Sequence, residues 1–205
     1  MQSSNFTKTK EFIAYASKYI KGSTIDLGAG SAKYRSIIEG RSSKYLTFDV
    51  SSGDRIDVVG DIQKLPFKEN NFDTIICTQV LEHVKKPWLA VKEMYRVIKP
   101  NGYSLVTVPF MLPYHAHPND YFRYTREGLV SIFEDAGFKI INCQYYGSIF
   151  MVISEMIHFN LFNPYKKHKL NLPQIMLVIE NIAGRLDKII KSENTNANVY
   201  IIAQK

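Results

Sequence analysis

The sequence contains only two cysteines, Cys77 and Cys143, and both lie inside apolar runs. Two isolated thiols form neither a structural zinc set nor a disulfide framework. The stretch MQSSNFTKTKEF at the N-terminus has no apolar core resembling a signal peptide. No run reaches the roughly 18 uncharged apolar residues that a membrane-spanning helix needs. These absences predict a cytoplasmic protein.

The chain also lacks internal repeats, low-complexity segments and an arginine-rich block. Its 205 residues suffice for one domain with a full core, or for one domain with an appendage. A content of 45% hydrophobic and 22% charged residues is typical of folded globular proteins. The net charge of +7 permits attraction to nucleic acid, anionic lipid or acidic substrates. Because the basic residues are dispersed and no nucleic-acid motif occurs, the charge alone indicates no such partner.

Strand and helix signals alternate through most of the chain. The predicted strands cover residues 24–27, 44–50, 56–61, 72–79, 104–110, 138–146 and 198–204. Helical periodicity covers residues 8–21, 33–39, 87–98 and 126–137, with a turn at 99–103, a Thr125 N-cap and a stop at Gly137. This alternation predicts an α/β fold with an open, doubly wound, mostly parallel sheet of seven strands. The last strand is the exception, an added or inserted edge strand.

The region from Gly147 to Ala197 breaks this alternation. Residues 149–162 and 173–190 have helical periodicity and wide apolar faces. The connection between them carries a small basic cluster, which consists of Lys166, Lys167, His168 and Lys169. We interpret about 148–196 as a helical insertion within a single domain of residues 1–205. Three roles are open to this insertion: a lid over the acceptor pocket, a homodimer contact or a peripheral membrane contact.

A glycine-rich turn, DLGAGSAKY, follows the first predicted sheet strand. Gly28 and Gly30 fill the first two places of a G-x-G-x-x-G dinucleotide loop, but Lys33 occupies the third. No G-K-[ST] follows, which excludes a Walker phosphate loop. Asp26 would repel a pyrophosphate and suits a ligand that carries an ammonium group. A tight packing turn without a ligand is the alternative.

Two further acids fall at the ends of the next two predicted strands. Asp49 occupies the position from which a carboxylate binds ribose hydroxyls. Asp61, with the apolar neighbour Ile62, suits an adenine amino group and its ring. Three acids along one sheet edge, with Asp26 as the first, predict an adenosine that has a cationic amino-acid tail and no phosphates. That ligand is S-adenosylmethionine.

Four motifs occur in the order DLGAG, LPFKENNFD, LEHV and IKPNG. This ordered set resembles the class I S-adenosylmethionine-dependent methyltransferases of type 11, over residues 22–147. The resemblance implies a Rossmann-like methyltransferase fold whose reversed seventh strand fits residues 198–204. It also implies cofactor contacts: Asp26, Gly28 and Gly30 around the methionine part, Asp49 on the ribose, Asp61 and Ile62 beside adenine, and Gln79 in the cofactor cleft.

The loop PFMLPYHAHPNDYFRYT, residues 109–125, follows the fifth predicted strand and is crowded with functional groups. It resembles an H-x-x-P-x-D-Y-F-R-[YWF]-T signature of bacterial methyltransferases linked to surface-glycan and sugar biosynthesis. We predict His115 as general base or substrate hydrogen-bond partner, with Asp120 orienting it or binding substrate. Tyr121, Arg123 and Tyr124 are the predicted substrate-binding residues.

Each of these assignments has a structural alternative. Asp120 and Arg123 can form an ion pair that fixes the loop, with His115 only capping it. His83, in LEHV, is either a base or, with Glu82, a structural link to the next helix. A metal site built from His115, His117 and Asp120 finds no further ligand in the pattern, so we predict no metal.

These features predict an S-adenosylmethionine-dependent methyltransferase that acts on a small-molecule or sugar hydroxyl, with surface-glycan biosynthesis as one setting. The positive net charge favours a nucleic-acid methyltransferase as an alternative. Against it, the sequence at the end of the fourth predicted strand is CTQV and contains neither an N-P-P-[YF] motif nor a cysteine-nucleophile motif. A non-catalytic, cofactor-binding partner subunit is a further alternative. Asp26 and Lys33 disfavour an NAD-dependent dehydrogenase.

Overall fold

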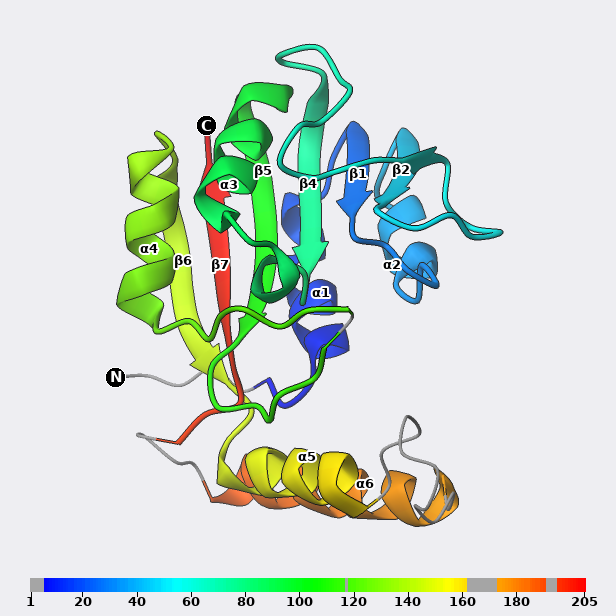
Figure 1. The fold of residues 1–205 in the computed structure, drawn as a ribbon, viewed down its shortest axis with the longest axis vertical. Helices are drawn as coiled ribbons and strands as arrows, with labels where there is room; N and C mark the ends of the chain where they lie inside the picture. Colours follow the sequence, from blue (N-terminus) through cyan, green and yellow to red (C-terminus); the bar gives the residue numbers. More distant parts are fainter. Residues whose placement is uncertain (1–5, 117, 162–172, 191–194) are drawn as a thin grey trace.

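A seven-stranded sheet in the order β3-β2-β1-β4-β5-β7-β6 forms the centre of the molecule (Figure 1). The computed structural model describes residues 6–116, 118–161, 173–190 and 195–205. The strands are β1 (Ser23–Leu27), β2 (Lys44–Asp49), β3 (Val58–Val59), β4 (Phe72–Thr78), β5 (Ile98–Pro109), β6 (Lys139–Tyr146) and β7 (Asn198–Gln204). Only β7 pairs in the antiparallel sense, with β5 on one side and β6 on the other. The predicted fold class is confirmed. The prediction that the last strand is an edge strand is wrong, because β7 lies between β5 and β6.

Helices cover both faces of this sheet. They are α1 (Thr9–Ala16), α2 (Arg35–Glu39), α3 (Pro87–Val97), α4 (Arg126–Asp135), α5 (Ile149–Leu161) and α6 (Pro173–Ile189), with short 3₁₀ turns η1 (Ser17–Tyr19) and η2 (Leu81–His83). Successive strand residues enter opposite cores because side chains alternate across a strand. Ile75, Val106 and Ile201 pack with α3 and α4, whereas Ile76, Leu105 and Ile202 pack with α1.

Local signals near the site explain where the elements begin and end. The Thr125 side chain accepts a hydrogen bond of 3.1 Å from the Gly128 amide, so the predicted N-cap of α4 is confirmed. The turn predicted over residues 99–103 is instead an irregular part of β5. Asn101 has a φ of +62°, and the pairing with β4 shifts between Phe72 and Thr74.

The helical insertion lies beyond the carboxyl ends of the parallel strands. In Figure 1, α5 and α6 run side by side across the end of the sheet toward which the arrows of β1 and β4 point. Lys8 forms a 2.9 Å ion pair with Glu180, and the Ser148 amide donates a 2.8 Å hydrogen bond to Asp187. The two predicted helices are confirmed over the described residues; Phe162 and the basic cluster at 166–169 lie outside them.

Several apolar side chains of the insertion are exposed. On α5 these are Ile153 and Met156, and on α6 they are Leu177, Val178, Ile182 and Ile189. Among the helices that the structure describes, none combines the length and apolarity needed to cross a membrane.

Candidate active site

The glycine turn after β1 is shaped by two residues in the left-handed region. Gly28 has a φ of +71° and Gly30 a φ of +52°. A Cβ atom at Gly28 would lie 2.3 Å from Cγ2 of Val80, so the turn passes directly against the segment that follows β4. A Cβ atom at Gly30 would meet nothing within 4 Å. The turn is therefore closed toward β4 and open at Gly30, as a ligand cradle requires.

The three acids predicted to bind the cofactor lie at or near the carboxyl ends of three neighbouring strands: Asp26 within β1, Asp49 as the last residue of β2, and Asp61 after β3. Asp26 is only 3% exposed; burial raises the pKa of its carboxyl to about 6, although a hydrogen bond from the Tyr45 hydroxyl opposes the rise. Asp49 accepts hydrogen bonds from the amides of Gly30 (2.9 Å) and Ser51 (3.0 Å). Asp61 is exposed, two residues beyond β3. The structure thus brings these carboxyl groups to one edge of the sheet.

The other two predicted cofactor residues are differently placed. Ile62 is 7% exposed, and its side chain packs into the core beneath α3. Gln79 follows β4 with a φ of +56°, and its side-chain amide donates a 3.2 Å hydrogen bond to the Thr107 hydroxyl. This bond holds the end of β4 to β5.

An ion pair fixes the loop that follows β5. The guanidinium of Arg123 donates to both carboxylate oxygens of Asp120, at 2.5 and 2.7 Å. It also donates to the carbonyl oxygens of Leu112, Pro113 and Phe122. The Asp120 side chain is 1% exposed, which makes this a buried, bidentate pair. The structure therefore shows the ion-pair arrangement that was the alternative for these two residues.

The same loop is anchored to the η2 turn. The Tyr121 amide donates a 2.7 Å hydrogen bond to the Glu82 carbonyl, and the hydroxyl of Tyr124 donates one of 2.8 Å to the Leu81 carbonyl. Tyr124 is buried in the core, whereas the Tyr121 ring is exposed. Of the two predicted substrate-binding tyrosines, only Tyr121 presents its ring to solvent.

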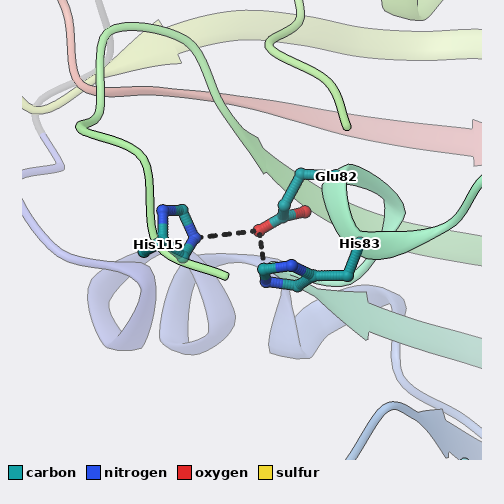
Figure 2. A group of neighbouring side chains, drawn as sticks. All are labelled: Glu82, His83 and His115. Carbon is teal, nitrogen blue, oxygen red and sulfur yellow. Dashed lines mark ion pairs between the residues drawn. The ribbon is translucent and has the colours of Figure 1, made fainter. Parts of the chain in front are cut away.

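Glu82, His83 and His115 converge where this loop meets η2 (Figure 2). Nε2 of His83 and Nε2 of His115 each lie 3.8 Å from Oε1 of Glu82. The Glu82 side chain is completely buried, and neither of its oxygens has a hydrogen-bond partner. We name these three side chains the EHH cluster.

Each imidazole of the EHH cluster is oriented by a backbone carbonyl. Nδ1 of His83 lies 2.6 Å from the Asn119 oxygen, and Nδ1 of His115 lies 2.9 Å from the Pro113 oxygen. Because a carbonyl can only accept, both Nδ1 atoms carry the proton. Burial lowers the pKa of His115, but its contacts with Glu82 and Pro113 and the charges of Asp120 and Glu82 raise it overall. His115 is thus set to accept a proton at Nε2.

Comparison with known proteins adds to this geometry. Residues 25–106 match the family model of a methyltransferase domain. An uncharacterized methyltransferase of Schizosaccharomyces pombe is 40% identical over 63 residues, which cover 31% of this chain and 23% of that protein. A methyltransferase of Archaeoglobus fulgidus, whose structure is described as S-adenosylmethionine-dependent, has a TM-score of 0.63 at 16% identity and covers 96% of this chain and 93% of its own.

Residues 25–106 are similar to a methyltransferase domain, and the sheet has the fold of a solved S-adenosylmethionine-dependent methyltransferase. The ubiquinone/menaquinone biosynthesis C-methyltransferase of a Ruegeria species is also similar, with 34% identity over 84 residues. That match covers 41% of this chain and 29% of the relative. The chain thus spans less than a third of the length of either curated relative named here.

S-adenosylmethionine is the cofactor named for the solved methyltransferase of Archaeoglobus fulgidus. The residues present fit it: the turn is open at Gly30, and Asp26, Asp49 and Asp61 offer acceptors for an amino group and for hydroxyls.

The sequence did not identify Glu82 as a partner of His115. The signal was present in LEHV, where Glu82 precedes a candidate histidine, but the meeting depends on how the later loop folds back. Of the alternative metal set, both carboxylate oxygens of Asp120 accept hydrogen bonds from Arg123, and His117 lies outside the described residues.

Proposed function

We propose that the chain transfers the methyl group of S-adenosylmethionine to a hydroxyl oxygen of a small molecule, with a sugar as one candidate acceptor. The observation that supports this is the EHH cluster, which pairs a buried carboxylate with two oriented imidazoles beside the cofactor turn. Val80, which touches Gly28, and Glu82 belong to the same short segment after β4. Acceptor activation and cofactor binding would then share one edge of the sheet.

The chemistry follows from the acidity of a hydroxyl. Its pKa lies far above 7, so attack on a methyl group is aided by a group that takes the proton. When bound, S-adenosylmethionine supplies a methyl group made electrophilic by a positively charged sulfur. Nε2 of His115 accepts the hydroxyl proton, while Nδ1 remains bonded to the Pro113 carbonyl. The Glu82 carboxylate stabilises the resulting imidazolium. Asp120 contributes by holding the His115 amide, at 2.8 Å.

Methyl-labelled cofactor and a panel of acceptors test this proposal. The panel contains nucleotide sugars, free sugars, phenols and quinols, with tRNA as the nucleic-acid arm. We expect label in an oxygen-linked methyl of one small-molecule class. His115→Gln should lower kcat by about 100- to 10,000-fold while leaving cofactor affinity by calorimetry unchanged. Wild-type turnover in that variant would remove the base assignment, and transfer only to tRNA would replace the acceptor class.

We infer that the insertion covers the acceptor side of the site. The Phe159 ring of α5 lies 5.6 Å from the His115 ring, centroid to centroid. The exposed apolar side chains of α5 and α6 leave homodimer and membrane contact as predictions. Light scattering tests the first, and cosedimentation with anionic vesicles at low salt tests the second.

A further inference from the structure

We propose that Glu82, His83 and His115 bind a divalent first-row transition-metal cation. Their ligand atoms all lie within 4.8 Å of one another, and the carboxylate oxygen sits between the two imidazoles (Figure 2). Two imidazole nitrogens and one carboxylate oxygen form a donor set typical of zinc, manganese, iron or cobalt.

The tautomers support a cation at this position. Nδ1 of His83 donates to the Asn119 carbonyl, and Nδ1 of His115 lies closer to the Pro113 carbonyl oxygen (2.9 Å) than to the Arg123 guanidinium (3.4 Å). With Nδ1 protonated in both neutral rings, both Nε2 atoms direct lone pairs toward Glu82. Two lone pairs facing a carboxylate repel it unless a cation or protons lie between them. Metal-binding histidines are commonly oriented in this way, with the second ring nitrogen bonded to a carbonyl.

The burial of Glu82 supplies the second, independent observation. Its carboxylate is completely buried, and neither oxygen receives a hydrogen bond. A buried carboxylate that receives no hydrogen bond is strongly unfavourable, and a cation bound between Glu82 and the two imidazoles would compensate its charge. The distance of 3.8 Å is too long for a hydrogen bond from either imidazole.

That distance is close to what a shared metal requires. Two ligand atoms about 2.1 Å from one ion lie roughly 3.4 Å apart in tetrahedral geometry. The two distances to Glu82 exceed this value by about 0.4 Å, and the three ligand atoms lie within 4.8 Å of one another, so closing the site also requires the two imidazole rings to rotate toward each other. Three protein ligands leave at least one coordination position open, and an oxygen of the acceptor suits it.

This inference rests on the geometry of three side chains, whereas its use in catalysis rests on the proposed function. A cation and a proton compete for the same lone pair of His115. With the cation bound, the acidity of the acceptor hydroxyl would come from the metal and His115 would serve as a ligand.

Calorimetry on the full chain, stripped with a chelator, tests the site with Zn²⁺, Mn²⁺ and Mg²⁺ as separate probes. We expect one Zn²⁺ or Mn²⁺ per chain and weaker binding of Mg²⁺. Glu82→Gln, His83→Ala and His115→Ala should each weaken binding at least ~100-fold. His158→Ala, a half-buried histidine on α5 outside the cluster, should leave it unchanged.

Melting temperatures distinguish a folded variant that does not bind the metal from a variant that does not fold. The metal should raise the melting temperature of wild-type protein and of His158→Ala, but not of folded Glu82→Gln. Absence of binding to stripped wild-type protein, or equal binding by Glu82→Gln, would overturn the site and leave a proton-bridged cluster. Binding without any methyl transfer would instead contradict the proposed function alone.

Discussion

The hydroxyl of Tyr45 donates a 2.8 Å hydrogen bond to the carboxylate of Asp26, joining β2 to β1 just before the glycine turn. Asp26 is almost fully buried, and this burial is the main cause of its raised pKa of about 6. The protein thus holds a carboxyl that can ionise near neutral pH at the position assigned to the amino group of the cofactor.

The unfolding free energy of the cofactor-free protein should depend on pH because of Asp26. Its folded-state pKa of about 6 exceeds the ordinary value, so its contribution is fully present below about pH 4 and is lost as pH rises through 6. Urea unfolding of wild type and Asp26→Asn should show the variant gaining on the order of 3 kcal/mol relative to wild type between pH 4 and 7.5. A constant difference across this range would contradict the assigned pKa.

Cofactor affinity should depend on pH in the opposite sense. An ammonium group favours ionised Asp26, so S-adenosylmethionine should bind more weakly as pH falls below 6. Calorimetry between pH 5 and 8 measures this trend. Asp26→Asn should bind more weakly at pH 8 and lose most of the pH dependence; an unaltered slope in this variant would point to another group.

Gly28 and Gly30 form a matched pair for alanine substitution. Both have positive φ, which costs an alanine about 1–2 kcal/mol. Gly28→Ala also drives a methyl group into Val80, so it should destabilise the free protein more than Gly30→Ala does. Gly30→Ala should instead weaken cofactor binding with a smaller loss of stability. Thermal unfolding measures the stability of both variants, and calorimetry measures their affinity for the cofactor. Equal destabilisation of the two variants would contradict the contact with Val80.

Arg123→Lys should loosen the loop despite keeping the charge. Lysine cannot reproduce the bidentate pair with Asp120 together with three bonds to backbone carbonyls. We expect a loss of about 2 kcal/mol in unfolding free energy, because Asp120 is left buried and poorly paired. Hydrogen exchange of residues 110–124 should accelerate. Unchanged exchange would show that η2 alone fixes the loop.

The sequence predicted the acids at the sheet edge because each lies near the carboxyl end of a strand, and the carboxyl ends of parallel strands meet. It could not predict the EHH cluster. Glu82 and His115 belong to different loops, and their approach depends on the Arg123 clamp and on the anchoring of Tyr124 to Leu81. The buried state of Ile62 likewise follows from tertiary packing, since an apolar residue beside Asp61 suits a ligand ring or the core equally.

The position of β7 between β5 and β6 sets an order for assembly. β6 has β7 as its sole neighbour in the described sheet, yet the whole helical insertion separates the two along the chain. During synthesis, β6 has no strand to pair with until Asn198–Gln204 emerges from the ribosome. That last strand must then insert between β5 and β6, which are already synthesised. Until β7 pairs with β5 and β6, the nascent chain exposes unpaired strand edges. At that stage chaperones can bind these edges, and the edges can pair with a wrong strand.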